Sequence, residues 1–182
     1  MTRGGAGGPN ALFARITMSG AACGKWLESP IRHVGDYSDW HDMNPRAAAS
    51  PDDLDNPGAR LEYMSVGEYL ETLADSSGFF CSEYDDDEGA FFIADAQMER
   101  GMSGISRLSA LLAAFRGAEA FKDDDEPSFV YVFPALGAGD PDALLRIRRG
   151  GSGFLPASDS SPDVLYFINE AEEFIEALTE DE

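Results

Sequence analysis

The chain has 182 residues, 34 of them acidic and 13 lysine or arginine, and its formal net charge is −21. Hydrophobic residues make up 43% of it, which is enough for a core and argues against a disordered chain. No apolar run approaches the roughly 20 residues of a transmembrane helix, and the negative field disfavours direct contact with nucleic acid. We therefore expect a folded protein with neither a membrane nor a nucleic-acid partner.

The negative charge is concentrated in parts of the chain. Residues 51–100 hold 14 acids and two bases, and residues 151–182 hold nine acids and no base, whereas residues 1–50 are nearly neutral. Charge of one sign destabilises the compact state by self-repulsion and exceeds what solubility needs. This concentration favours a protein that binds a cationic partner.

The length suits one domain. Residues 1–10 are rich in glycine, which predicts a disordered tail, and residues 11–182 form the expected single α+β domain. Residues 11–18 alternate loosely between apolar and other side chains, which predicts a first strand.

The segment that follows has no clear periodicity. Small residues at 19–24 predict a turn, and residues 25–44 predict short helical or irregular pieces. Proline, aspartate and alanine predict a surface loop at 45–57.

A helix and a hairpin are predicted next. Ser65 and Glu68 have the spacing of a capping box, in which each side chain binds the other's backbone N–H. Apolar side chains then recur with helical spacing from Val66 to Leu73. The runs 79–84 and 90–97 resemble strands, and the acidic connection between them ends in a glycine, which is typical of a hairpin.

The last third predicts a second helix at 103–118 and a fully apolar, central strand at 129–133. Residues 141–149 permit either a short helix or a strand. Residues 164–168 predict another strand, followed by a terminal helix from residue 169. That helix is expected to turn Ala171, Phe174, Ile175 and Leu178 inward.

These elements together predict an α+β fold, a mostly antiparallel sheet with a β-hairpin, covered by two or three helices.

The sequence holds no convincing catalytic motif. Cys23 has no histidine base downstream of His41, and neither a Gly-x-Ser-x-Gly nor a phosphate-binding loop is present. We therefore predict no enzyme and no cofactor, although a site built from scattered carboxylates stays open. Two cysteines, Cys23 and Cys81, do not make a disulfide framework, so reduced thiols in a cytoplasmic protein are expected.

The sequence contains possible metal ligands, but not in the spacing of a known metal site. His33 and His41 lie among three aspartates, but their spacing matches no familiar motif. Taking Gly58 or Gly89 as the central glycine of a calcium loop gives only partial matches. No metal site is predicted.

The one basic cluster is formed by Arg146, Arg148 and Arg149. The arginines could meet the dipole at the end of a helix or pair with the chain's own acids. Both readings are favoured over nucleic-acid contact.

Aromatic side chains among acids suit a protein interface, because rings anchor the partner and carboxylates select a cationic one. Two further acidic runs are predicted to be turns. The predicted partner-binding residues are Asp36, Tyr37, Asp39, Trp40, Asp85, Asp86, Asp87, Glu88, Asp123, Asp124 and Asp125.

The chain is small, strongly acidic and of the predicted α+β class. In these properties, and above all in the aromatic–acidic stretch at residues 36–40, it resembles bacterial immunity proteins that neutralise polymorphic or contact-delivered toxins. The resemblance implies a stoichiometric antidote that occludes a cognate, basic toxin. Two alternatives are a DNA mimic that inhibits a nucleic-acid-binding enzyme and a module that binds a basic peptide. The oligomeric state is left open.

Overall fold

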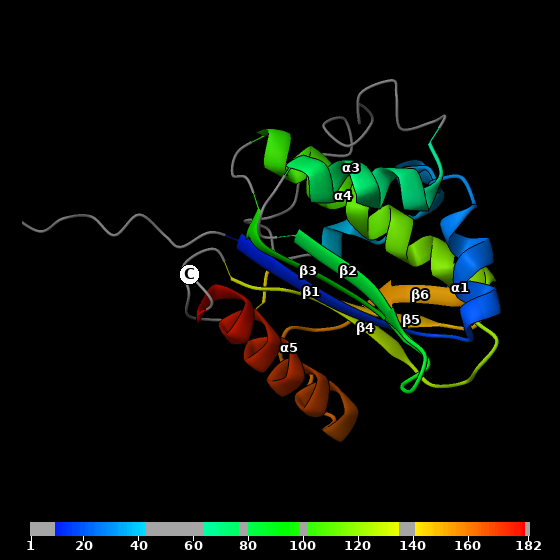
Figure 1. The fold of residues 1–182 in the computed structure, drawn as a ribbon. Coiled ribbons are helices and arrows are strands. Elements are labelled where there is room, and N and C mark those ends of the chain that lie inside the picture. Colours follow the sequence, from blue (N-terminus) through cyan, green and yellow to red (C-terminus); the bar gives the residue numbers. More distant parts are fainter. Residues whose placement is uncertain (1–9, 43–63, 77–79, 99–101, 135–140, 181–182) are drawn as a thin grey trace, which may run out of the picture.

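A computed structural model describes residues 10–42, 64–76, 80–98, 102–134 and 141–180 (Figure 1). The predicted loop at 45–57 and most of the predicted tail, residues 1–9, lie outside these residues. The described strands form one antiparallel sheet in the order β2-β3-β1-β4-β5-β6. The strands are β1 (Asn10–Thr17), β2 (Phe80–Asp85), β3 (Ala90–Met98), β4 (Ser128–Val132), β5 (Ala143–Arg148) and β6 (Gly151–Phe154).

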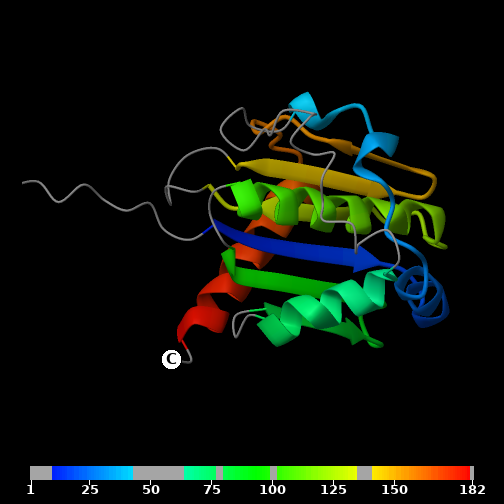
Figure 2. The same cartoon turned by 90° about the horizontal axis from the view of Figure 1, so that it is seen from above.

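Helices cover both faces of the sheet, which confirms the predicted α+β class. Helices α1, α3 and α4 lie on one face, and α5 crosses the other (Figures 1 and 2). The four described α-helices are α1 (Gly20–Leu27), α3 (Val66–Ser76), α4 (Met102–Arg116) and α5 (Pro162–Glu180); the 3-10 turns are η1 (Val34–Asp36), η2 (Trp40–Asp42) and η4 (Gly117–Ala120).

The alternation of strand β1 divides the core into two layers. Leu12, Ala14 and Ile16 point into the cluster under α3 and α4, whereas Phe13 packs against α5. All five residues of β4 are buried, as the prediction of a central strand requires. Side chains on both faces of the middle strands are therefore removed from water, which stabilises the domain by roughly 25 cal/mol per Å² of apolar surface.

The predicted capping box and hairpin are confirmed. The Ser65 N–H donates to Glu68 (2.8 Å) and the Glu68 N–H to the Ser65 hydroxyl (3.2 Å) at the start of α3. Strands β2 and β3 pair up to Asp85 opposite Ala90. Gly89 closes the turn with φ of 61°, a conformation that glycine adopts without the steric cost that other residues incur.

Two predictions at helix starts are wrong. Residues 19–24 are not a turn, because Ser19 caps α1 by accepting from the Ala22 N–H (3.2 Å). The strand predicted at 164–168 belongs to α5, which begins at Pro162 rather than at residue 169. Proline suits the first turn of a helix, and Val164 and Phe167 are buried with helical spacing.

The open choice at 141–149 is resolved as a strand, because β5 spans Ala143–Arg148. Ala143, Leu145 and Ile147 point to the α4 face, and Leu144 points to the α5 face. Arg146 and Arg148, at the next alternate positions, follow Leu144 to that side.

Candidate partner-binding site at the end of strand β1

The two acidic turns lie on either side of the end of β1. On the hairpin side, the Met18 N–H donates to the Gly89 carbonyl (3.0 Å) and the Tyr84 hydroxyl to the Met18 carbonyl (2.9 Å). On the other side, the Ser19 N–H donates to Asp123 (2.9 Å). These contacts bring two acidic runs, 35 residues apart in sequence, to one end of the sheet. We call this set the acidic rim: Asp85, Asp86, Asp87, Glu88, Asp123, Asp124, Asp125 and Glu126.

A buried lysine holds the second acidic run against β1. Lys122 is 3% exposed, and its ammonium group lies 2.9 Å from a carboxylate oxygen of Asp124. It also donates to the hydroxyls of Thr17 (2.7 Å) and Ser128 (2.9 Å) and to the Thr17 carbonyl. Burial lowers the pKa of Lys122, while the Asp124 carboxylate opposes that shift. The next residue, Asp125, is exposed to solvent.

Within the rim, some of the predicted carboxylates accept hydrogen bonds that hold the turns, and others are exposed. Asp85 accepts from the N–H groups of Asp87 (2.8 Å) and Glu88 (3.0 Å) and so closes its own turn. Hydrogen bonds from Ser19 lower the pKa of Asp123. The carboxylates of Asp86, Asp87 and Asp125 are exposed.

A third acidic element reaches the rim through Arg15 of β1. Its guanidinium group lies 3.5 Å from Glu88, 3.4 Å from Glu126 and 3.8 Å from Glu170 of α5. One cation thus faces three carboxylates, which leaves this cluster net negative. Burial raises the pKa of Glu170; Arg15 opposes the shift, and the charges of Glu88 and Glu126 add to it.

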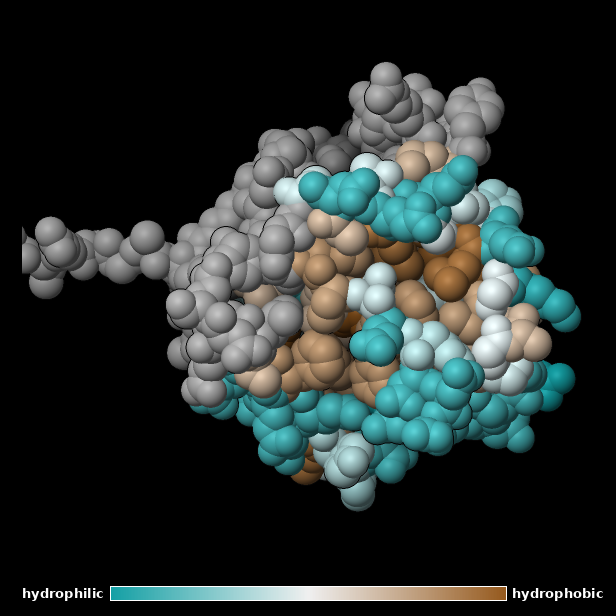
Figure 3. All heavy atoms as spheres, in the orientation of Figure 1, coloured by the Kyte–Doolittle hydropathy of each residue, from teal (hydrophilic) through white to brown (hydrophobic). Residues whose placement is uncertain are grey.

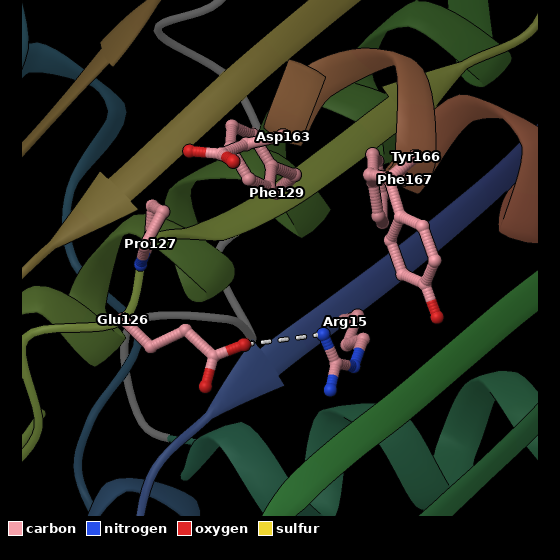
Figure 4. A pocket seen from close by; sticks show the side chains of 7 residues that line it. All are labelled: Arg15, Glu126, Pro127, Phe129, Asp163, Tyr166 and Phe167. Carbon is pink, nitrogen blue, oxygen red and sulfur yellow. Dashed lines mark hydrogen bonds and ion pairs between the residues drawn. The ribbon is translucent and has the colours of Figure 1, made fainter.

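A pocket of about 230 Å³ opens beside Arg15 (Figure 4). In this view Glu126 and Asp163 lie on one side of it, and Tyr166 and Arg15 lie on the other (Figure 4). Binding pockets for small molecules are usually about 300–1,000 Å³, so this pocket suits one side chain better than a whole cofactor.

An exposed aromatic side chain borders this pocket. Tyr166 is 69% exposed and its neighbour Leu165 is 47% exposed, and among the described side chains of α5 they are the large hydrophobic ones that are exposed to solvent. Hydrophilic side chains cover the same part of the surface over α5 and the hairpin turn, whereas apolar ones gather over β2 and β3 (Figure 3). An exposed ring within an acidic surface is the arrangement that the sequence suggested for residues 36–40.

The structure places the predicted aromatic–acidic stretch elsewhere and gives it internal partners. Asp39 pairs with Arg116 of α4 at 2.7 and 3.2 Å, and Trp40 is only 8% exposed. The Tyr37 ring centroid lies 3.8 Å from the guanidinium carbon of Arg116. Asp36 accepts from the His33 N–H (3.2 Å). Partner binding by this stretch stays a prediction, and no contact among the described residues joins it to the acidic rim.

This stretch covers the outer edge of β6. The Phe154 N–H donates to Asp39 (3.4 Å), and the Arg116 guanidinium donates to the Ser152 carbonyl (3.1 Å). An uncovered strand edge would invite pairing with another chain. The Arg116–Asp39 pair therefore terminates the sheet at β6.

Sequence reasoning missed Arg116, Arg15 and Lys122. Arg116 is 2% exposed, although its place in the last turn of α4 is typical of a solvated residue near a helix end. The available signal was the nearby Tyr37, Asp39 and Trp40, which could have been interpreted as a cage for an arginine rather than as an interface.

The histidines make local contacts, and the cysteines are unpaired thiols. His33 accepts from the Gly35 N–H through Nδ1 (3.0 Å), and His41 lies 3.3 Å from Asp42. Across the described ranges, no group of three His, Cys, Asp or Glu side chains could hold a metal ion. Cys23 and Cys81 are free thiols, and burial raises the pKa of Cys23 to about 11. No helix in the described part of the chain has the length and apolar character needed to cross a membrane.

Comparisons with known proteins name no relative. Neither the scan against protein-family models nor the searches of curated proteins and of solved structures found a match to this chain.

Proposed function

We propose that this chain is a binding protein of the immunity type, which uses the acidic rim to occlude the basic surface of a cognate bacterial toxin. The observation that carries the proposal is the convergence of both acidic turns and Glu170 of α5 at the end of β1. The fold contains ion pairs that hold these elements together but leaves the exposed carboxylates of Asp86, Asp87 and Asp125 without a described partner.

The two parts of the site would act at different steps of binding. Exposed carboxylates raise the local potential and speed the encounter with a cationic protein, toward about 10⁸–10⁹ M⁻¹s⁻¹ at low salt. Tyr166 and Leu165 provide apolar area that becomes buried in the complex, and buried aromatic side chains commonly dominate binding energy. The rim would therefore set the association rate and Tyr166 the dissociation rate.

The pocket beside Tyr166 fits a lysine or arginine side chain of the partner. Asp163 supplies a carboxylate at its edge, Glu126 supplies a second one that Arg15 partly neutralises, and the Tyr166 ring supplies a face for a cation. Occlusion would follow once such a side chain of the toxin is held here and is no longer available to its substrate.

The test is to express the chain together with the product of the gene adjacent to its own and to measure the dissociation rate of the complex. Tyr166→Ala is expected to raise the dissociation rate at least tenfold, which corresponds to the 1.4 kcal/mol or more typical of an aromatic anchor. Because Tyr166 is exposed, the free energy of unfolding should change by less than about 0.5 kcal/mol. Dissociation unchanged by Y166A would remove α5 from the interface.

A further inference from the structure

Strand β5 and the turn that follows it place three arginines around a hollow beside β6, and two of them, Arg146 and Arg148, point to the α5 face of the sheet. Their register sets Arg146 opposite Gly153 and Arg148 opposite Gly151. Cross-strand partners point to the same face, and glycine has no side chain. Open space therefore lies beside Arg148 at Gly151, whereas at Gly153 a carboxylate oxygen of Asp39, which Arg116 already pairs with, lies 3.7 Å from where a Cβ would be. The result is a hollow of about 430 Å³ whose lining includes the three arginines, the two glycines and Leu155. We call it the arginine hollow.

Of the two roles predicted for these arginines, the helix-end role is wrong, and no ion pair with the chain's own acids is found among the described residues. The segment is a strand followed by a turn at Gly150, whose φ is 75°, so the arginines do not meet the dipole of a helix end. Within the described residues, the guanidinium groups of the arginine hollow form no ion pair or hydrogen bond, whereas Arg15, Arg107 and Arg116 each pair with a carboxylate. The charge of Arg146 reaches Asp159 without an ion pair.

The geometry of the arginine hollow favours a compact anion with more than one charge. Residues two apart on a strand lie roughly 7 Å apart on one face, so Arg146 and Arg148 repel each other when nothing lies between them. A guanidinium group presents paired N–H donors that match the oxygens of a phosphate. A phosphate can accept from both arginines at once, whereas a single carboxylate has fewer oxygens to share.

We propose that the arginine hollow binds the phosphoryl group of a small phosphorylated molecule, of the size of a nucleoside monophosphate. Its volume lies within the range of about 300–1,000 Å³ that is usual for small-molecule sites, and Leu155 gives it an apolar wall. Strands β1 and β5 both run antiparallel to β4, so this hollow and the acidic rim share one end of the sheet. An extended polyanion would meet the carboxylates of the rim, and a compact one would not.

The experiment titrates the full chain with adenosine monophosphate and with inorganic phosphate, at constant ionic strength set by sodium chloride. Calorimetry gives the affinity, and amide chemical shifts of the ¹⁵N-labelled protein locate the site. We expect shifts at Gly151 and Gly153, and a loss of affinity of at least about tenfold in Arg146→Gln and in Arg148→Gln, since each removes a charge-assisted hydrogen bond. Arg32→Gln, which removes an exposed arginine elsewhere, should change the affinity less than twofold.

Three results would overturn the proposal. The first is an absence of shifts at these glycines in the wild-type chain at millimolar ligand, a result that does not depend on any variant folding. The second is an equal loss of affinity in Arg32→Gln, which would indicate general charge attraction. The third is tighter binding of a single-stranded oligonucleotide than of the monophosphate, which would indicate a nucleic-acid surface. None of them bears on the acidic rim, so the proposed toxin binding would stand or fall separately.

Discussion

At the residue scale, the buried Arg116 is the most consequential side chain outside the acidic rim. It is 2% exposed and is satisfied by Asp39 together with Ser152. Burying a charge is tolerated only when a partner and hydrogen bonds replace its hydration. Asp39 thus connects Arg116 of α4 with Phe154 of β6.

Replacing Asp39 with asparagine should destabilise the fold by about 3 kcal/mol at pH 7, because it leaves Arg116 buried without a counter-charge. Urea unfolding checks this, with Asp42→Asn as the control. Asp42 is exposed and pairs only with the exposed His41, so that change should cost less than about 1 kcal/mol. Equal stability of both variants would show that Arg116 does not depend on Asp39.

The Asp39 effect should also depend on pH. Burial raises the pKa of Asp39, but hydrogen bonds and charge from Arg116 outweigh this and lower it. A lowered folded-state pKa means that the stabilisation is complete above the ordinary value of about 3.9 and is lost as pH falls through the folded value. The difference between wild type and D39N should therefore shrink below about pH 4.

Glu170 should behave in the opposite way, because burial raises its pKa and one of its carboxylate oxygens is buried without a hydrogen-bond partner among the described residues. Its ionised form weakens the fold above the raised folded-state pKa, and this cost vanishes below the ordinary value of about 4.3. Glu170→Gln is expected to be more stable than wild type at pH 7 and equally stable near pH 3, as measured by thermal unfolding. If E170Q were less stable than wild type at pH 7, the ion pair between Glu170 and Arg15 would outweigh the cost of burying the carboxylate. Glu172→Gln, which changes an exposed neighbour, is the control.

At the element scale, the hairpin between β2 and β3 positions half of the acidic rim. Its turn depends on Gly89, whose φ is 61°. No atom would lie within 4 Å of a Cβ added there, so a larger residue would meet backbone strain but no steric clash. Gly89→Ala should therefore cost about 1–2 kcal/mol through backbone strain alone. Gly24→Ala, in the exposed face of α1 with equal free space, should instead stabilise by about 0.5–1 kcal/mol. Chemical denaturation of both variants checks the opposite signs.

Most elements could be predicted from local patterns, because alternation, helical spacing and capping residues act over a few positions. The capping box of α3, the acidic hairpin and the buried strand β4 were predicted in this way. The start of α5 was not, since residues 164–168 are as apolar as a short strand and only Pro162 marks the helix. A short apolar run does not by itself distinguish a strand from a buried helix.

The candidate site was predicted only in part. The sequence identifies runs of carboxylates at 85–88 and 123–126 as exposed turns, because such residues cannot be buried together. It does not reveal that β1 pairs with both β3 and β4, and that pairing brings the two runs together. The roles of Arg15 and Lys122 follow from the same long-range contacts. For residues 36–40 the sequence does not distinguish a partner from the internal Arg116, because a ring beside an acid can face either.

At the scale of the whole molecule, the net charge of −21 is organised rather than diffuse. Ion pairs of Arg15 and Lys122 hold the acidic elements at one end of the sheet, and the arginine hollow lies at the same end, two strands away from β1. Two surface features of opposite charge therefore lie at one end of the sheet. The uneven charge thus favours specific recognition over simple solubility.

The role of the acidic rim is tested by the association rate with the co-expressed toxin candidate, measured by stopped-flow fluorescence at several salt concentrations. The variant D86N/D87N/D125N removes three exposed rim charges without touching Asp85, which closes its turn. The control E71Q/D75N/E172Q removes three exposed charges outside the rim. We expect the rim variant to associate at least tenfold more slowly at low salt and with a weaker salt dependence, and the control to keep nearly the wild-type rate. Equal rates for the two variants would contradict the assignment of the acidic rim as the binding surface.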